Sequence, residues 1–234
     1  MVQEKIFCIG LPRTGTTSLC KFLNMIGLAT KHFPFEIFQN TNYTLLVLNM
    51  IGLKTKDLPF QLDLNLNNLF LNKYVGFGDS PIPLIYKDLD RNFPNSKFIL
   101  TTRSLDSWLD SMQWLFEHGK VKWNWSIKVH IYHHIFLGTK TFRKRILEHK
   151  FADFHTDVLR YFESRPKDLL ILDMEKGFGT KEICDFLQVP ATQLEYPHSN
   201  KRTTTTFDER VSYEFRQRKI LLNSLVKKLG KDLK

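Results

Sequence analysis

The sequence predicts an α/β protein with a three-layer fold, in which a central parallel sheet is flanked by helices. Two patterns support this prediction. Short apolar runs that suit strands alternate along the 234 residues with stretches of helical periodicity, as is typical of parallel sheets. A loop rich in glycine and hydroxyl residues joins the first apolar run to the first helical stretch, which is the context of a phosphate-binding loop. The length favours one domain over residues 1–234.

Four apolar runs are expected to be the strands, at residues 5–9, 74–77, 97–102 and 168–172. Helices are expected at residues 17–27, 104–117, 181–187 and 208–229, because their apolar residues recur three or four positions apart. For the closing helix, Asp208 is the expected N-cap and Gly230 the expected first residue after the end. Residues 35–72 and 118–164 are mainly helical in pattern, so we expect helical insertions over the mouth of an active site.

The composition favours an anionic partner. The chain has 34 Lys and Arg against 24 Asp and Glu, a formal net charge of +10, which suits a phosphorylated cofactor, nucleic acid or acidic lipid. No run of about 18 apolar residues is present, so no membrane span is expected. The start does not read as a signal peptide, and three cysteines do not suggest a disulfide framework. We therefore expect a cytoplasmic protein with buried free thiols.

The strongest motif is the loop G-L-P-R-T-G-T-T-S at residues 10–18. Its glycines let backbone N–H groups turn inward, and the helix that follows adds its positive end. Arg13 supplies a fixed charge, and the side chains of four residues offer further hydroxyl donors: Thr14, Thr16, Thr17 and Ser18. This combination predicts an anion-binding site.

The spacing of Gly10 and Gly15 matches a nucleotide-hydrolysing P-loop, but Thr16 stands where that loop has its lysine. Hydrolysis of ATP or GTP is therefore less favoured. Asp173, after the fourth predicted strand, keeps an ATP-dependent small-molecule kinase open as an alternative. The basic closing helix keeps open a non-catalytic protein that binds nucleotide or nucleic acid, although no specific nucleic-acid motif is visible.

The loop resembles the 5′-phosphosulfate loop of sulfotransferases that use 3′-phosphoadenosine 5′-phosphosulfate (PAPS). That resemblance implies cofactor contacts from residues 12–18, namely Pro12, Arg13, Thr14, Gly15, Thr16, Thr17 and Ser18. A second match is independent of the first: Arg103 ends a predicted strand and Ser111 follows eight residues later. In the family, residues at these positions bind the 3′-phosphate.

A third match points to the small branch of the family that includes the schistosome drug-activating enzyme. It consists of Gly78-Asp79-Ser80-Pro81 and the segments around Tyr86 and Phe93. The resemblance implies that Asp79 is the catalytic base and that His32 and Glu36 face the acceptor. The Gly-rich loop of the better-known members is missing here, and the resemblance implies that Asn200, Lys201 and Arg202 take its place on the 3′-phosphate.

The implied reaction transfers a sulfuryl group from PAPS to a hydroxyl or amine of a small molecule, with PAP as the second product. Arg13 would stabilise the charge on the bridging oxygen, and Asp79 would take the acceptor proton. We expect Asp79 to be partly buried, with a raised pKa or a strong bond to the nucleophile; the alternative is that it caps a helix that starts near Pro81. Trp123 and Trp125 are either pocket or core residues, and the histidines at positions 130, 133 and 134 are not expected to bind metal.

Overall fold

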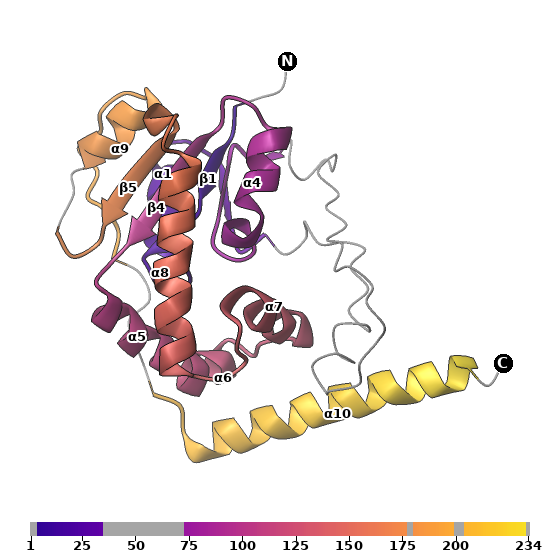
Figure 1. The fold of residues 1–234 in the computed structure, drawn as a ribbon. Coiled ribbons are helices and arrows are strands. Elements are labelled where there is room, and N and C mark those ends of the chain that lie inside the picture. Colours follow the sequence, from indigo (N-terminus) through magenta and orange to yellow (C-terminus); the bar gives the residue numbers. More distant parts are fainter. Residues whose placement is uncertain (1–3, 35–72, 177–179, 199–203, 233–234) are drawn as a thin grey trace.

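The computed structural model describes residues 4–34, 73–176, 180–198 and 204–232. Within them, a five-stranded parallel sheet has the strand order β2-β3-β1-β4-β5 (Figure 1). Its strands are β1 (Ile6–Cys8), β2 (Thr30–His32), β3 (Gly76–Gly78), β4 (Lys97–Thr102) and β5 (Leu169–Asp173). Helices cover both faces of the sheet, so the predicted α/β fold class is confirmed.

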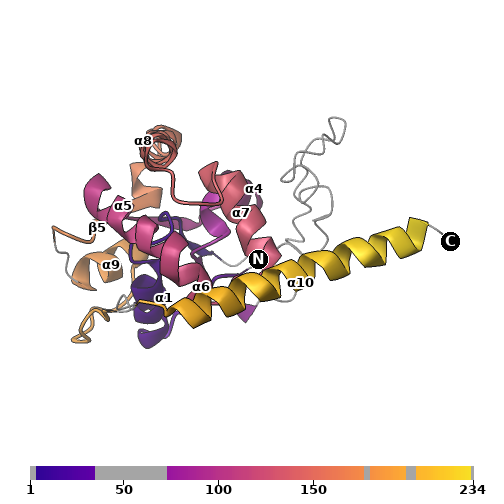
Figure 2. The ribbon, with the colours of Figure 1, turned by 90° about the horizontal axis from the view of Figure 1, so that it is seen from below.

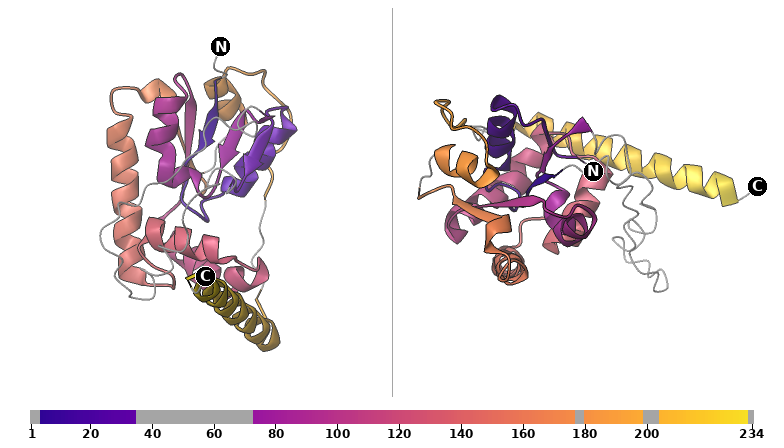
Figure 3. Two further views of the ribbon diagram at one scale, coloured as in Figure 1. Left: turned by 90° about the vertical axis from the view of Figure 1, so that its right-hand side faces the viewer. Right: turned by 90° about the horizontal axis from the view of Figure 1, so that it is seen from above.

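The two helical layers follow from the alternation of side chains along the strands. Phe7 and Phe98 belong to one apolar cluster, with helices α4 (Ile82–Asn92) and α8 (Lys144–Tyr161). Ile6 and Ile99 belong to the other cluster, with α1 (Thr16–Met25) and α9 (Thr180–Leu187). Since successive residues of a strand point to opposite faces, each strand binds both layers, and Figure 3 shows the sheet between them.

The strand order creates a crevice at one edge of the sheet. After β1 the chain moves to β2 on one side, whereas after β4 it moves to β5 on the other side. The loops that leave β1 and β4 therefore run in opposite directions, and open α/β sheets bind their ligands outside the strand carboxyl ends at such a point.

A helical insertion lies at this carboxyl edge (Figure 1). It consists of α5 (Leu105–Trp114), a π-helical turn η2 (Leu115–Gly119), α6 (Lys120–Lys122) and α7 (Ile127–Leu137). The expectation of a mainly helical stretch over residues 118–164 is thus confirmed, while the one over residues 35–72 lies outside the described residues. A short 3-10 turn, η3 (Pro166–Asp168), leads into β5.

The first part of the long closing helix α10 (Phe207–Asp232) packs against α6, and its Tyr213 bonds to His130 of α7. The helix then extends beyond the rest of the fold (Figure 2). The cap predicted for it is wrong. Thr206 Oγ1 accepts from the N–H of Glu209 at 3.2 Å, and Glu209 Oε2 accepts from the N–H of Thr206 at 2.7 Å. This reciprocal capping box places the N-cap at Thr206 rather than Asp208, and the helix continues through Gly230.

The structure adds one strand that the sequence did not predict and agrees with the expectation for the cysteines. Strand β2 was not predicted, because Thr30–His32 is too short to show a period. It is held partly by Asn24 of α1, whose side chain exchanges two hydrogen bonds of 2.9 Å with the backbone of Thr30. The three cysteines are buried and free, as expected. Among the described residues, no helix combines the length and apolar character needed to cross a membrane.

Candidate active site

The loop of residues 10–15 leaves β1 and turns into α1. Arg13 has a φ of 73° and Gly15 a φ of 97°, and both values lie in the left-handed region. A Cβ on Gly15 would lie 2.7 Å from Sδ of Met174, so a side chain there would meet both strain and crowding. No acidic residue lies in the first turn of α1, which leaves the positive end of the helix available to an anion.

Thr14 differs from the other hydroxyl residues of the loop. Its side chain is fully buried, and Oγ1 donates to the carbonyl of Leu11 at 2.7 Å and lies 2.8 Å from Oγ1 of Thr101. Thr14 also does not line the cavity described below. Its hydroxyl therefore fastens the loop to β4 and does not offer a donor to a ligand, in contrast to the expectation from sequence.

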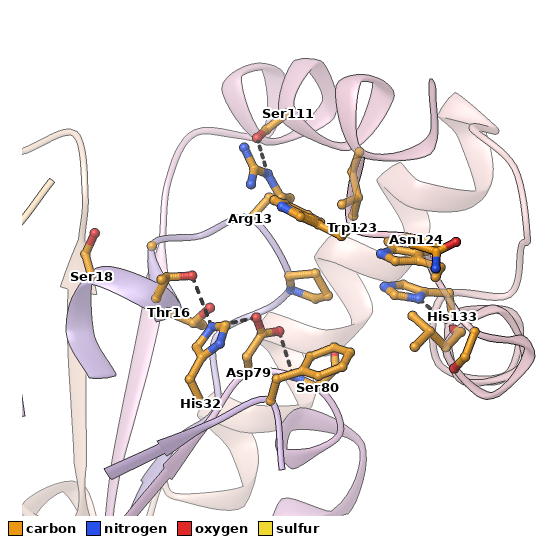
Figure 4. Close-up of a pocket in the computed structure, with 18 of the residues that line it drawn as sticks. Arg13, Thr16, Ser18, His32, Asp79, Ser80, Ser111, Trp123, Asn124 and His133 are labelled. Carbon is orange, nitrogen blue, oxygen red and sulfur yellow. Dashed lines mark hydrogen bonds and ion pairs between the residues drawn. The ribbon is translucent and has the colours of Figure 1, made fainter. Parts of the chain in front are cut away.

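A cavity of about 820 Å³ opens at the carboxyl ends of β1, β3 and β4 (Figure 4). Its wall comes from the loop after β1, from the carboxyl ends of β2, β3 and β4, and from the helical insertion. The lining residues are Pro12, Arg13, Gly15, Thr16, Thr17, Ser18, His32, Phe33, Asp79, Ser80, Arg103, Ser111, Leu115, Trp123, Asn124, Trp125, Ser126, Val129 and His133. Every described residue that the sequence analysis assigned to the site, apart from Thr14, lies on this wall.

Arg13 is fixed on two sides by the insertion. Its Nε donates to Oγ of Ser111 at 3.0 Å (Figure 4), and its guanidinium lies over the rings of Trp114 and Trp123, at 4.7 and 5.6 Å from their centroids. Such contacts orient a cation without neutralising it. The charge of Arg13 is therefore held in the cavity next to the positive end of α1.

Arg103 directly follows β4 and contacts the backbone of the loop after β1. Its Nη1 donates to the carbonyl of Arg13 at 3.3 Å. Its Nε is buried and, among the described residues, has no hydrogen-bond partner; Oε1 of Glu175 is 3.6 Å away. Hydrogen bonds from Ser107 and Ser104, at the start of α5, hold the carboxylate of Glu175. These bonds lower the pKa of Glu175 to about 2. Arg103 thus has a buried donor that a phosphate oxygen could satisfy.

Asp79 and His32 form an ion pair at the ends of β3 and β2 (Figure 4). Oδ2 of Asp79 is 2.9 Å from Nε2 of His32, and Oδ1 accepts from the N–H of Ser80 at 2.6 Å. The side chain of Asp79 is 18% exposed, so the expected partial burial is confirmed. Helix α4 has its N-cap at Pro81, and the carboxylate of Asp79 turns to His32 instead of capping this helix.

Of the two alternatives expected for Asp79, the raised pKa is wrong, and the strong bond to the nucleophile stays a prediction. Burial raises this pKa, but the charge of His32, its hydrogen bond and the N–H of Ser80 together lower it below the ordinary value. The same pair acts in reverse on His32: burial lowers the pKa of the imidazole, and the charge and hydrogen bond of Asp79 raise it above the ordinary value. The sequence did not reveal this pairing, because the two residues are 47 positions apart.

The wall opposite Asp79 is aromatic. Trp125 stacks on His133 with ring centroids 4.3 Å apart and an interplanar angle of 6°. Nδ1 of His133 donates to the carbonyl of Val129 at 2.8 Å, and burial lowers the pKa of His133 to about 4. At neutral pH the ring is therefore uncharged, with Nε2 as a hydrogen-bond acceptor. Trp123 lines the cavity, and Trp125 both lines it and belongs to the apolar core, so for Trp125 both interpretations apply. His133, which the sequence analysis did not expect to bind metal, lines the cavity as well.

The comparison with known proteins agrees with these features. A family model described as "Sulfotransferase domain" matches residues 5–205. The chain belongs to the sulfotransferase family. Ava biosynthesis cluster protein M of Aspergillus versicolor is 29% identical over 213 residues, which are 83% of this chain and 80% of that protein. A crystal structure of a sulfotransferase from Alicyclobacillus acidocaldarius is 14% identical with a TM-score of 0.47, and the match covers 93% of this chain and 92% of that one.

Four residues that the resemblance to sulfotransferases implies lie outside the described residues: Glu36, Asn200, Lys201 and Arg202. Within the described parts of this sulfotransferase, no group of three or more His, Cys, Asp or Glu side chains could hold a metal ion. His130 instead bonds to the hydroxyl of Tyr213, and His133 bonds to its own helix.

Proposed function

We propose that this sulfotransferase transfers the sulfuryl group of PAPS to a hydroxyl or amine of a small-molecule acceptor, with Asp79 as the general base. One observation carries the proposal: a fixed guanidinium and a partly buried carboxylate, those of Arg13 and Asp79, line the same cavity from the ends of adjacent strands. A cation for the leaving phosphate and a base for the acceptor are the two groups that in-line sulfuryl transfer needs.

The residues of the cavity fit an anionic donor with two separate phosphate groups. The turn of residues 10–15 and the first turn of α1, which has no acidic residue, suit the 5′-phosphosulfate. The unsatisfied Nε of Arg103, with Ser111 across the loop, suits the 3′-phosphate. Asn200, Lys201 and Arg202 remain proposed contacts of that phosphate.

The proposed chemistry divides between the two sides of the cavity. The donor supplies the sulfuryl group: its bond from sulfur to the 5′-phosphate oxygen breaks, and the electron pair stays on that oxygen. The acceptor oxygen or nitrogen forms the new bond to sulfur, and its proton passes to Asp79. Arg13 and the N–H groups of the loop stabilise the negative charge that grows on the leaving oxygen.

The charge state of Asp79 suits the start of this reaction. Because His32 keeps the pKa of Asp79 low, the carboxylate is ionised at neutral pH and can accept a proton. A carboxylate is a weak base, so the transfer of the proton accompanies the formation of the bond to sulfur and does not precede it. Such a base works best when it is held close to the acceptor.

Asp79→Asn tests the proposal. This change keeps the shape of the side chain and removes its ability to take a proton, so turnover should fall roughly 100-fold or more. The assay follows transfer of labelled sulfur from PAPS to a panel of phenols, alcohols and amines. Asp110→Asn, at an exposed aspartate of α5, is the matched control and should keep full activity. A folded Asp79→Asn protein with near-normal turnover would remove Asp79 as the base.

A ligand comparison separates the proposal from the kinase and nucleic-acid alternatives. Thermal unfolding is followed with PAP, with Mg-ATP and with an oligonucleotide, all at one concentration of about 100 times the Kd of PAP. A ligand that binds the folded state as tightly as PAP should then stabilise the protein by about 2.7 kcal/mol. We expect this of PAP alone, and stabilisation by Mg-ATP but not by PAP would overturn the proposal.

A further inference from the structure

One ring nitrogen of His32 connects the two halves of the cavity. Nε2 lies 2.9 Å from Oδ2 of Asp79 and 3.0 Å from Oγ1 of Thr17. Asp79 follows β3, whereas Thr17 lies in the first turn of α1, next to the loop proposed to bind the donor. The imidazole at the end of β2 thus stands between the proposed base and the donor side, and Figure 4 shows it pointing at Asp79.

The hydrogen atoms fix the direction of these contacts. An ionised carboxylate can only accept, so the one hydrogen of Nε2 is donated to Asp79. Nε2 then has no free lone pair, and Oγ1 of Thr17 can only share the same hydrogen as a second acceptor at 3.0 Å. The other oxygen of the carboxylate accepts from the N–H of Ser80 at 2.6 Å. Both oxygens of Asp79 are therefore held in place, one by the backbone and one by a side chain that also contacts α1.

We propose that His32 is a positioning residue: it holds the carboxylate of Asp79 toward the acceptor and ties it to the donor side through Thr17. This inference rests on the proposed function, in which Asp79 is the base. It assigns His32 a task different from the acceptor contact that the family resemblance implies. Strand β2 brings His32 to this place, because it pairs with β3 with His32 and Gly78 in register, and Asp79 follows directly.

The test of this proposal measures how the His32–Asp79 pair titrates, so the other groups that affect the pKa values of the pair must be named. Among the described residues, the other titratable groups that act on it are Cys20 and Lys21 of α1, and Tyr132 and His133 of α7. All of them stay in place when His32 alone is changed. A shift in the pH profile of a His32 variant therefore reports the loss of the imidazole and its charge.

Two variants of His32 separate position from charge. His32→Gln can place an amide N–H near the position of Nε2 but cannot carry a charge, and His32→Phe removes both. The rate is measured as PAP released from PAPS, with 2-naphthol as acceptor and in parallel with water alone, from about pH 3 to about pH 9, so that the range reaches below the ordinary pKa of a carboxyl group. Melting temperatures and the Kd of PAP are measured for each variant.

We expect His32→Phe to lower kcat roughly 10- to 100-fold, because a small displacement of a reacting group is costly. His32→Gln should lose less than about tenfold. In His32→Gln the acid limb of the profile should move up by roughly one pH unit or more, because the positive neighbour that favours the ionised carboxylate is gone. The affinity for PAP should change little in either variant, since His32 is not assigned to donor binding.

A second readout needs neither donor nor acceptor. The imidazole of His32 is titrated by NMR in the protein alone and in Asp79→Asn. Loss of the carboxylate should lower the pKa of His32, because the partner that favours the imidazolium has been removed. An unchanged titration of His32 in Asp79→Asn would show that the two side chains are not coupled and would overturn the inference.

The kinetic outcomes distinguish this inference from the proposed function. If Asp79→Asn keeps its turnover, the base assignment fails and the role of His32 fails with it. If Asp79→Asn is inactive but the acid limb of His32→Gln coincides with that of the wild type, the function stands and the positioning role of His32 is refuted. A 10- to 100-fold loss of kcat in His32→Phe, together with a loss of less than about tenfold and a shifted acid limb in His32→Gln, supports it.

Discussion

The stability of the protein should fall in mild acid because of His133. The side chain is 3% exposed and is stacked on Trp125. Burial lowers its pKa from 6.5 to about 4. In the unfolded chain the same imidazole takes up a proton below about pH 6.5. Protons therefore favour the unfolded state between these two values, and stability is lost as the pH falls from 6.5 toward 4.

The size of the effect follows from the two pKa values of His133. Between pH 7.5 and pH 5, the linkage relation gives a loss of about 2 kcal/mol. The full loss below pH 4 is roughly 3 kcal/mol, since one pKa unit is about 1.4 kcal/mol. For a protein of this length, 2 kcal/mol corresponds to a decrease in melting temperature of roughly 4–8 °C.

Urea unfolding at pH 7.5 and pH 5 measures the loss in the wild type and in His133→Phe. Phenylalanine keeps a ring against Trp125 but cannot take up a proton, so the variant should lose about 2 kcal/mol less than the wild type. The partly buried His130, whose pKa is also lowered by burial to about 4, is present in both proteins, so its contribution cancels. His149→Gln, at an exposed histidine of α8, serves as the control for a surface change. Equal losses in the wild type and in His133→Phe would refute the reasoning.

Two predictions concern the loop after β1. Thr14→Val removes the hydroxyl that bonds to Leu11 and Thr101. It should cost roughly 1–3 kcal/mol of stability in urea unfolding, with the Kd of PAP changed less than about threefold; a large loss of PAP affinity at unchanged stability would contradict it. Ser111→Ala removes the hydrogen bond to Nε of Arg13. By calorimetry it should weaken PAP binding roughly 3- to 10-fold, the worth of one such bond, and unaltered binding would exclude Ser111 from the donor site.

The strands and the loop could be predicted because their signals are local. The strand at residues 97–102 was predicted with the bounds that the structure has, since a buried strand of a parallel sheet is a continuous apolar run. The loop was predicted from residues that are consecutive in the chain. The gathering of Arg13, Arg103 and Asp79 in one cavity also agrees with the sequence, because the carboxyl ends of parallel strands meet at one edge.

The features that the sequence did not predict depend on contacts between distant segments. Whether a threonine of the loop faces a ligand or the sheet depends on Thr101, which is 87 residues from Thr14. The pKa of Asp79 depends on His32, which comes from a strand too short to be recognised. The cap at Thr206 is different, because it could have been predicted from the sequence alone. Thr206 and Glu209 form a capping-box pattern three residues apart.

The backbone around the cavity gives an independent reason to regard it as functional. Among the described residues, six that are not glycine have a positive φ, and four of them line the cavity: Arg13, Phe33, Asp79 and Asn124. Each such conformation costs roughly 1–3 kcal/mol and persists only where the surrounding structure enforces it. Two of the four carry the proposed cation and base, and a third directly follows His32. The fold is thus destabilised at the positions where the side chains of a reaction centre must be held in one orientation. A cavity that arose only from imperfect packing would not require such strained residues in its wall.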